Sequence, residues 1–293
     1  MTEQYSRRRF LAGASLTGAG LLAGCLGDSN SGETEASETA TTTEALPDVV
    51  TEIGFDGMDL VVGLQPDAAV SKLNLISPDG TAFASKSVTR GATTVRIPIL
   101  DADTGFNEPK HYTPGLHELV VITEESAERI PVSLEPDIQL VNVRVNSDAT
   151  NIEDRGKLEF TVENVGTGPT WVFDITYEDA PNSRANIPLN EYPGFARFEW
   201  PNETRDFVVG PAEQRSFVDD LNPLRFPGQE YSGCDLGTFE IRAKIGVANG
   251  DLIEADIKSE IGGAEINRNM YAKYGCDESV VEVIAIRRSK WEN

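Results

Sequence analysis

Two histidines, His111 and His117, are the only side chains of this sequence with an ordinary pKa near neutrality. Such a residue is the usual proton donor or acceptor of an enzyme. The two lie six positions apart, with Pro114 and Gly115 between them, so they need not converge on one site. Neither Gly-x-Ser-x-Gly nor His-Glu-x-x-His occurs in the chain. We therefore predict a protein that is not an enzyme, although a mechanism based on carboxylates alone stays open.

Three cysteines offer different chemistry. Cys234 and Cys276 lie far apart in sequence, and in an exported chain such a pair is expected to form a disulfide. A metal or redox pair is the competing interpretation, but it needs closer spacing or a nearby histidine. A blue-copper site is disfavoured, because no histidine follows Cys276. Cys25 stands apart, near the start of the chain.

The segment from Asp101 to Glu108 places oxygen-bearing side chains around a glycine, a pattern suited to a hard cation such as Ca²⁺. The candidate ligands are Asp101, Asp103 and Asn107. The calcium-loop pattern is incomplete, because Tyr112 occupies the twelfth position, where a glutamate is required. A solvated acidic loop is the favoured interpretation, with calcium as the alternative; no other cofactor is expected.

Aromatic residues gather in a stretch rich in proline and glycine. Exposed, they would form a surface for a glycan or a protein partner. The more ordinary role is to hold a long loop against a sheet. The candidate binding residues are Tyr192, Phe198 and Trp200, beside Phe195 and Phe207. Asn202 begins the sequon Asn202-Glu203-Thr204, which would place a glycan at the surface.

Acidic residues outnumber basic ones by 48 to 25 over 293 residues, for a formal net charge of −23. Nucleic-acid binding is disfavoured, because a phosphate backbone requires a basic surface. The carboxylates are spread along the chain, a composition similar to that of proteins from extreme halophiles, with an ordinary acidic protein as the alternative. Molar salt shortens the Debye length to about 3 Å, which screens the repulsion among these charges.

The first residues resemble an export signal and a lipid-attachment site. Arg7 and Arg8 precede Phe10 and Leu11, as in twin-arginine signals, and a weakly apolar stretch follows that is too short to span a bilayer. Leu22-Ala23-Gly24-Cys25 resembles a lipobox. The combination is similar to twin-arginine-exported lipoproteins of haloarchaea. It implies removal of residues 1–24, lipidation of Cys25 and location on the outer face of the cell membrane. Residues 25–47, rich in Thr, Ser and acids, are expected to form a disordered stalk.

From Val49 onward, short alternating runs are separated by turn residues, which predicts an all-β fold of two tandem antiparallel sandwiches. Pro136 suggests a boundary between domains at 48–135 and 136–293, with an insertion near 179–204. Ser77–Gly80 is expected to form a turn, and Asn249-Gly250 a type I′ hairpin. The expected strands are 60–62, 73–76, 82–88, 94–97, 118–122, 130–134, 138–145, 158–164, 171–177, 238–245 and 280–286.

Residues 137–178 and 205–247 resemble CARDB-like immunoglobulin-fold modules of prokaryotic surface proteins, which pair an alternating apolar strand with an Asn-x-Gly turn. The insertion and the lack of an acidic, Asn-rich closing strand depart from that pattern. The resemblance implies a binding or spacer module, held at the membrane by its lipid and facing an unknown surface protein or glycan. A solute-binding lipoprotein of a transport system is the alternative, and a surface hydrolase a weaker one.

Overall fold

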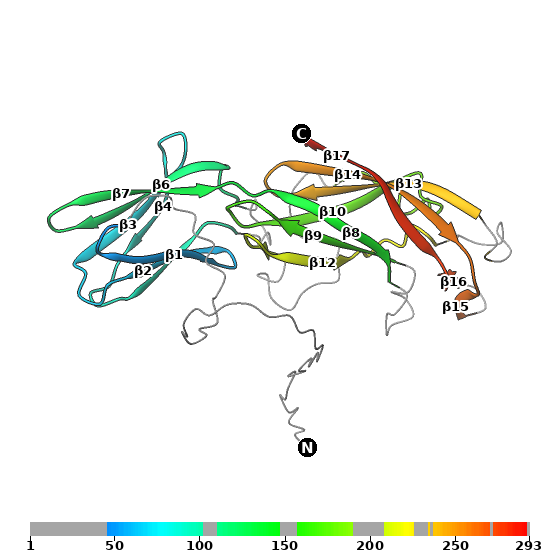
Figure 1. The fold of residues 1–293 in the computed structure, drawn as a ribbon, viewed down its shortest axis with the longest axis horizontal. Coiled ribbons are helices and arrows are strands. Elements are labelled where there is room, and N and C mark those ends of the chain that lie inside the picture. Colours follow the sequence, from blue (N-terminus) through cyan, green and yellow to red (C-terminus); the bar gives the residue numbers. More distant parts are fainter. Residues whose placement is uncertain are drawn as a thin grey trace, which may run out of the picture. The chain divides into compact units, whose positions relative to one another are not determined.

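The computed structural model describes residues 46–101, 110–146, 157–189, 208–225, 234, 237–269 and 272–291. The regular elements in these ranges are β-strands arranged in antiparallel sheets, as the sequence predicts (Figure 1). The described residues include no helix long and apolar enough to cross a membrane.

Strands β1–β7, here called the N-terminal half, form two sheets with the orders β1-β2-β5 and β4-β3-β6-β7. Leu60 and Ile97 from the first sheet and Leu75 and Leu119 from the second are almost completely buried in one apolar core. The two sheets are therefore arranged as a sandwich. The strands are β1 (Val50–Asp56), β2 (Asp59–Leu64), β3 (Val70–Ile76), β4 (Ala82–Ser87), β5 (Thr94–Pro98), β6 (Gly115–Thr123) and β7 (Ala127–Leu134).

Strands β8–β17, here called the C-terminal half, form a three-stranded sheet, β12-β9-β8, a five-stranded sheet, β11-β10-β13-β14-β17, and the hairpin β15-β16. The strands are β8 (Ile138–Val145), β9 (Leu158–Asn164), β10 (Thr170–Glu178), β11 (Val208–Val209), β12 (Gln214–Val218), β13 (Gly237–Val247), β14 (Asp251–Ile261), β15 (Glu265–Asn269), β16 (Ala272–Cys276) and β17 (Val280–Lys290).

The alternation of buried and less buried side chains explains most of these strands. In β9, Leu158, Phe160 and Val162 are buried while the residues between them are half-buried, which is the two-residue period of a strand with one face on the core. The next strand, β10, is buried at every position from Thr170 to Tyr177. Both of its faces are covered, so a polar residue on either face needs a partner inside the protein.

Two predicted turns have different outcomes. The turn at Ser77–Gly80 is confirmed: the Gly80 amide donates to the Ser77 carbonyl, 2.9 Å away, and Gly80 has a φ of +83°. The hairpin at Asn249-Gly250 exists, but the predicted type I′ turn is wrong. Only Gly250 has a positive φ, and its amide donates to Val247, so Ala248 and Asn249 form a type I turn closed by a left-handed glycine.

Among the described strands, those of each half pair only within that half. By its contacts, however, Thr39–Asn293 is one compact unit, so the division into two domains at Pro136 stays a prediction. The expected strands include no counterpart of β1, β11, β12, β15 or β16, and β14 is implied only by the expected hairpin at Asn249-Gly250. Strand β1 was missed because Gly54 interrupts its apolar pattern and most of its residues are exposed or half-buried.

Candidate functional site

His117 is a buried packing residue of β6. Its Nδ1 lies 3.1 Å from the Gly115 carbonyl, and its ring meets the edges of Phe83 and Tyr112 at centroid distances of 6.3 and 5.9 Å. The exposed neighbour Leu116 points to the opposite face, as the strand pattern predicts. Burial lowers the pKa of His117, so the neutral imidazole is favoured.

His111 bridges the two halves. Its Nδ1 donates to the Tyr112 carbonyl at 2.7 Å, and its Nε2 therefore accepts from the Thr170 hydroxyl at 3.0 Å. The ring also packs against Tyr112 and Trp171, with centroids 4.4 and 5.4 Å away. Burial lowers the pKa of His111 to about 4, so it is uncharged at neutral pH. Both nitrogens are occupied, which leaves none to accept a proton from a substrate.

Tyr112 lies between the two histidines and contributes to the same contact between the two halves. Its buried hydroxyl donates to the Pro169 carbonyl at 2.6 Å. A side chain at Gly168 would collide with this hydroxyl and press on the backbone of Leu134. The glycine thus lets the loop before β6 approach the chain that enters β10.

Residues 135–137, the segment between β7 and β8, are held by the turn after β9. The Val165 amide donates to the Asp137 carbonyl at 2.9 Å, and the Thr167 amide donates to the Glu135 carbonyl at 2.8 Å. A side chain at Gly166 would collide with the backbone of this segment. The segment is therefore bonded along its length and is not a free linker.

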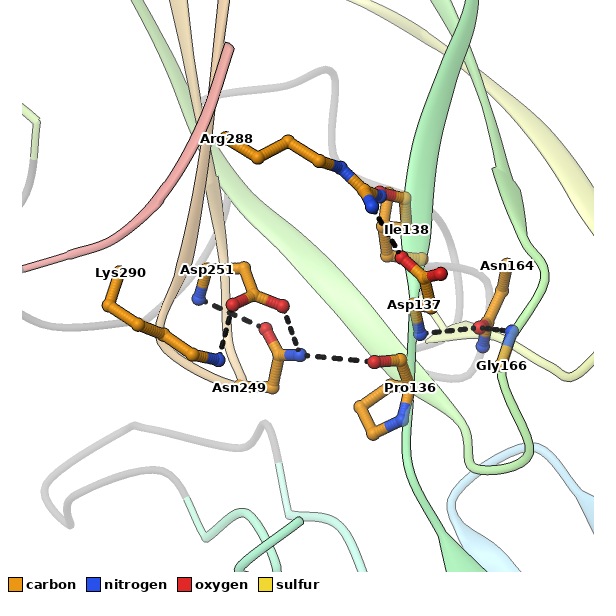
Figure 2. A network of polar contacts seen from close by, with 9 residues as sticks. All are labelled: Pro136, Asp137, Ile138, Asn164, Gly166, Asn249, Asp251, Arg288 and Lys290. Atoms are coloured by element: carbon orange, nitrogen blue, oxygen red, sulfur yellow. Dashed lines mark hydrogen bonds and ion pairs between the residues drawn. The ribbon is translucent and has the colours of Figure 1, made fainter.

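Asn164 organises that turn from a fully buried position. Its Oδ1 accepts from the Asp137 and Gly166 amides at 3.1 and 3.0 Å (Figure 2). Its Nδ2 donates to the Gly168 and Val209 carbonyls at 2.8 and 2.9 Å. Four hydrogen bonds satisfy the amide, so this buried polar group orders the backbone around it.

The opposite side of residues 135–137 is held from β17 and the β13–β14 turn (Figure 2). Arg288 forms an ion pair with Asp137 at 2.7 Å and donates to the Ile138 carbonyl. Asn249 lies between Asp251 and Pro136, with its Nδ2 2.8 Å from the Asp251 carboxylate and 3.5 Å from the Pro136 carbonyl. These contacts, together with those of Asn164, Tyr112 and His111, are called the joint below.

The C-terminal half also buries a carboxyl group, Asp219, which has no exposed surface. Burial raises the pKa of Asp219 to about 8, and the nearby acids Asp220 and Asp174 contribute in the same direction. The hydroxyl of Tyr177, on β10, interacts with this carboxyl group. Burial, and secondarily the charge of Asp219, raises the pKa of Tyr177 well above its usual value.

The predicted disulfide is confirmed: Cys234 and Cys276 are bonded, with Cα atoms 5.8 Å apart. Asp101 forms an isolated backbone pair with Lys110, while Asp103 and Asn107 lie outside the described residues. No cluster of three or more potential metal ligands occurs in the described ranges. Calcium binding stays a prediction. Also outside the described residues are Arg7, Arg8, Phe10, Leu11, Cys25, Tyr192, Phe198, Trp200 and Asn202.

Sequence reasoning identified neither Asn164 nor Asp219 as special. Asn164 begins the Asn-x-Gly sequence that the CARDB-like resemblance includes, and that pattern does mark the buried amide of the joint. Asp219 carries no local signal, because one acid among 48 stands out only once the chain is folded.

No protein-family model matches this chain, and no curated protein matches its sequence.

Proposed function

We propose that this chain is an exported surface protein, anchored through a lipid on Cys25, that works as a non-catalytic spacer or binding module. The joint is the observation that supports this function best. A spacer must hold its two ends at a set separation, and residues 135–137 are bonded on both sides by the backbone of Val165 and Thr167 and by Arg288.

The placement of the histidines also supports a non-catalytic role. His111 bonds through both ring nitrogens, and His117 is buried between aromatic rings. Neither is offered to a substrate as a proton acceptor, which is the usual part of histidine in hydrolysis. Spacing is the form of the proposal that these contacts favour, and binding by the aromatic residues near Trp200 is the other form.

The anchor is tested by Cys25→Ser in cells, with Ser31→Ala as the matched control. We expect the Cys25 variant to leave the lipid-anchored fraction and the control to stay there. A Cys25→Ser protein that remains in the membrane pellet after a salt wash would contradict the anchor.

The spacing role is tested by pulsed electron paramagnetic resonance on the full chain, with spin labels carried by unnatural amino acids at Lys86 and Lys258. Both positions are exposed, on β4 and β14. One narrow distance distribution is expected, and a broad one would contradict a spacer.

The non-catalytic role is tested separately, by assaying the protein in molar salt on ester, peptide and glycan panels. Turnover above that of a heat-unfolded sample would contradict it and favour the hydrolase.

A further inference from the structure

Asp219, the residue that follows the end of β12, directs its carboxyl group into the core. Phe217 and Asp219 are two positions apart and both are buried, while Val218 between them is half-buried. The Asp219 amide donates to the Leu158 carbonyl at 3.1 Å, and one carboxyl oxygen, Oδ1, accepts from the Leu221 amide at 3.0 Å. The backbone thus fixes the position of the carboxyl group.

The second carboxyl oxygen is differently placed. Within the described part of the chain, neither Asp219 Oδ2 nor the Tyr177 hydroxyl has a partner with regular hydrogen-bond geometry, although the two groups interact. Two acids act on Asp219: Asp174, on β10, and Asp220, next to it in the chain. Lys157 lies 3.8 Å from Asp220 and is directed to that more exposed carboxylate. A buried carboxylate facing a phenol and two acids would be an uncompensated charge.

The residues after Asp219 form hydrogen bonds with part of the chain that follows β10. Asn182 donates from its Nδ2 to the Asn222 carbonyl at 2.8 Å and from its amide to the Pro223 carbonyl at 3.2 Å. The Ala185 amide in turn donates to the Asn182 carbonyl at 2.8 Å. Residues 219–225 and 180–186 are therefore linked, and Asp219 is the first residue of the segment 219–225.

We propose that Asp219 is a proton-binding site, and that residues 219–225 and 180–186 stay docked on the core only while this proton is bound. The protonated carboxyl group is neutral and is compatible with the buried position beside Tyr177. When the proton leaves, the carboxylate must be hydrated, and the short path to water is the undocking of residues 219–225. This inference does not depend on the proposed function.

Hydrogen–deuterium exchange of the full chain at pH 6.5 and pH 9.5, corrected for intrinsic exchange rates, tests the proposal. We expect protection of the Leu221, Asn182 and Ala185 amides to fall tenfold or more at pH 9.5. Amides of the β13–β14 ladder report whether the loss is local and should keep their protection. Equal protection of the three amides at both pH values would overturn the proposal.

Two variants assign the effect to one proton. Asp219→Asn keeps the shape of the neutral acid, so its three amides should be equally protected at both pH values. Asp220→Asn is the matched control and should keep the pH-dependent loss of protection, because it retains the Asp219 carboxyl group. A pH-dependent loss that persists in Asp219→Asn would overturn the assignment.

Infrared titration of the unmodified protein decides the question even where Asp219→Asn does not fold. A carbonyl stretch of a protonated carboxylic acid is expected at pH 6.5, where exposed acids are ionised, and it should disappear above pH 9. The absence of that band at pH 6.5 would contradict the proton site.

Discussion

The interiors of the two halves are built differently. Among the residues that the structure describes, His117 is the one buried polar side chain of the N-terminal half, whereas the C-terminal half buries a larger set. They are Asn164, Thr170, Asp174, Thr176, Asn182, Asp219, Asn222, Ser259 and Ser279. The fold of the N-terminal half is specified mainly by the alternation of apolar and polar side chains along its strands. The C-terminal half also contains irregular segments, such as 179–189 and 219–225, whose backbone groups need polar partners inside the protein.

This difference gives the two regions opposite responses to pH. At the joint, His111 is buried without a charge and resists protonation, whereas Asp219 in the C-terminal half resists deprotonation. Acid is therefore expected to weaken the joint, and alkali the C-terminal half.

Asp219→Asn should have the largest effect. The unfolded chain loses this proton near pH 3.8 and the folded chain near pH 8, so unfolding releases a proton between these values. Stability from this group therefore falls as pH rises through that window, by up to about 6 kcal/mol. The asparagine variant should lack the decline and should exceed the parent in free energy of unfolding at pH 9. Denaturant unfolding of both proteins at pH 4, 6.5 and 9 measures this, and parallel curves would contradict it.

Removing the disulfide with Cys234→Ser and Cys276→Ser should rank next. The bond closes a separation of 42 residues, which corresponds to about 4 kcal/mol on the chain-entropy estimate. The loss should be concentrated in the C-terminal half, as measured by hydrogen exchange of β13 and β14. Equal losses in β3 and β6 would mean that the two halves unfold as one, and the comparison between them would fail.

His111→Gln tests how the joint responds to acid pH. The unfolded histidine binds its proton near pH 6.5 and the folded one near pH 4, so unfolding takes up a proton between these values. Stability from this group is present above pH 6.5 and is lost as pH falls to 4, by about 3 kcal/mol. Glutamine cannot make this titration, so the parent and the variant should converge as the solution is acidified. Lys110→Gln is the neighbouring control. If His111→Gln lost as much free energy of unfolding as the parent between pH 6.5 and 4, His111 would not be the group that makes the joint sensitive to acid.

Arg288→Gln should have the smallest effect on stability, because it removes an ion pair whose side chains are 44% and 45% exposed. Such pairs contribute at most about 1 kcal/mol. The distance distribution between labels at Lys86 and Lys258 should nevertheless broaden, since Asp137 loses its partner. Arg287→Gln on the same strand, whose partner is Asp256, should leave the distribution unchanged. Equal broadening in both variants would show that the pair at Asp137 has no special part in the joint.

The strands could be predicted largely because the alternation of apolar and polar residues is visible within each short stretch of sequence. The runs 138–145 and 158–164 coincide with β8 and β9, since burial of one face requires a two-residue period. The turn at Asn249 was assigned to the wrong type because its sequence fits two loop lengths, and strand register decides between them. Neither the joint nor the environment of Asp219 could be read from the sequence. Both depend on contacts such as that of Arg288 with Asp137, 151 positions apart, and no local pattern records such a pairing.

The contact between Arg288 and Asp137 also imposes an order on biosynthesis. Residue 288 lies in β17, the last strand that the structure describes, and its partner is the residue just before β8. A ribosome completes the N-terminal half and most of the C-terminal half before this arginine emerges. The nascent protein therefore carries a joint that is open on its β17 side until β17 has been synthesised. A chain truncated before β17 would lose the edge strand that carries Arg288 and, with it, that side of the joint.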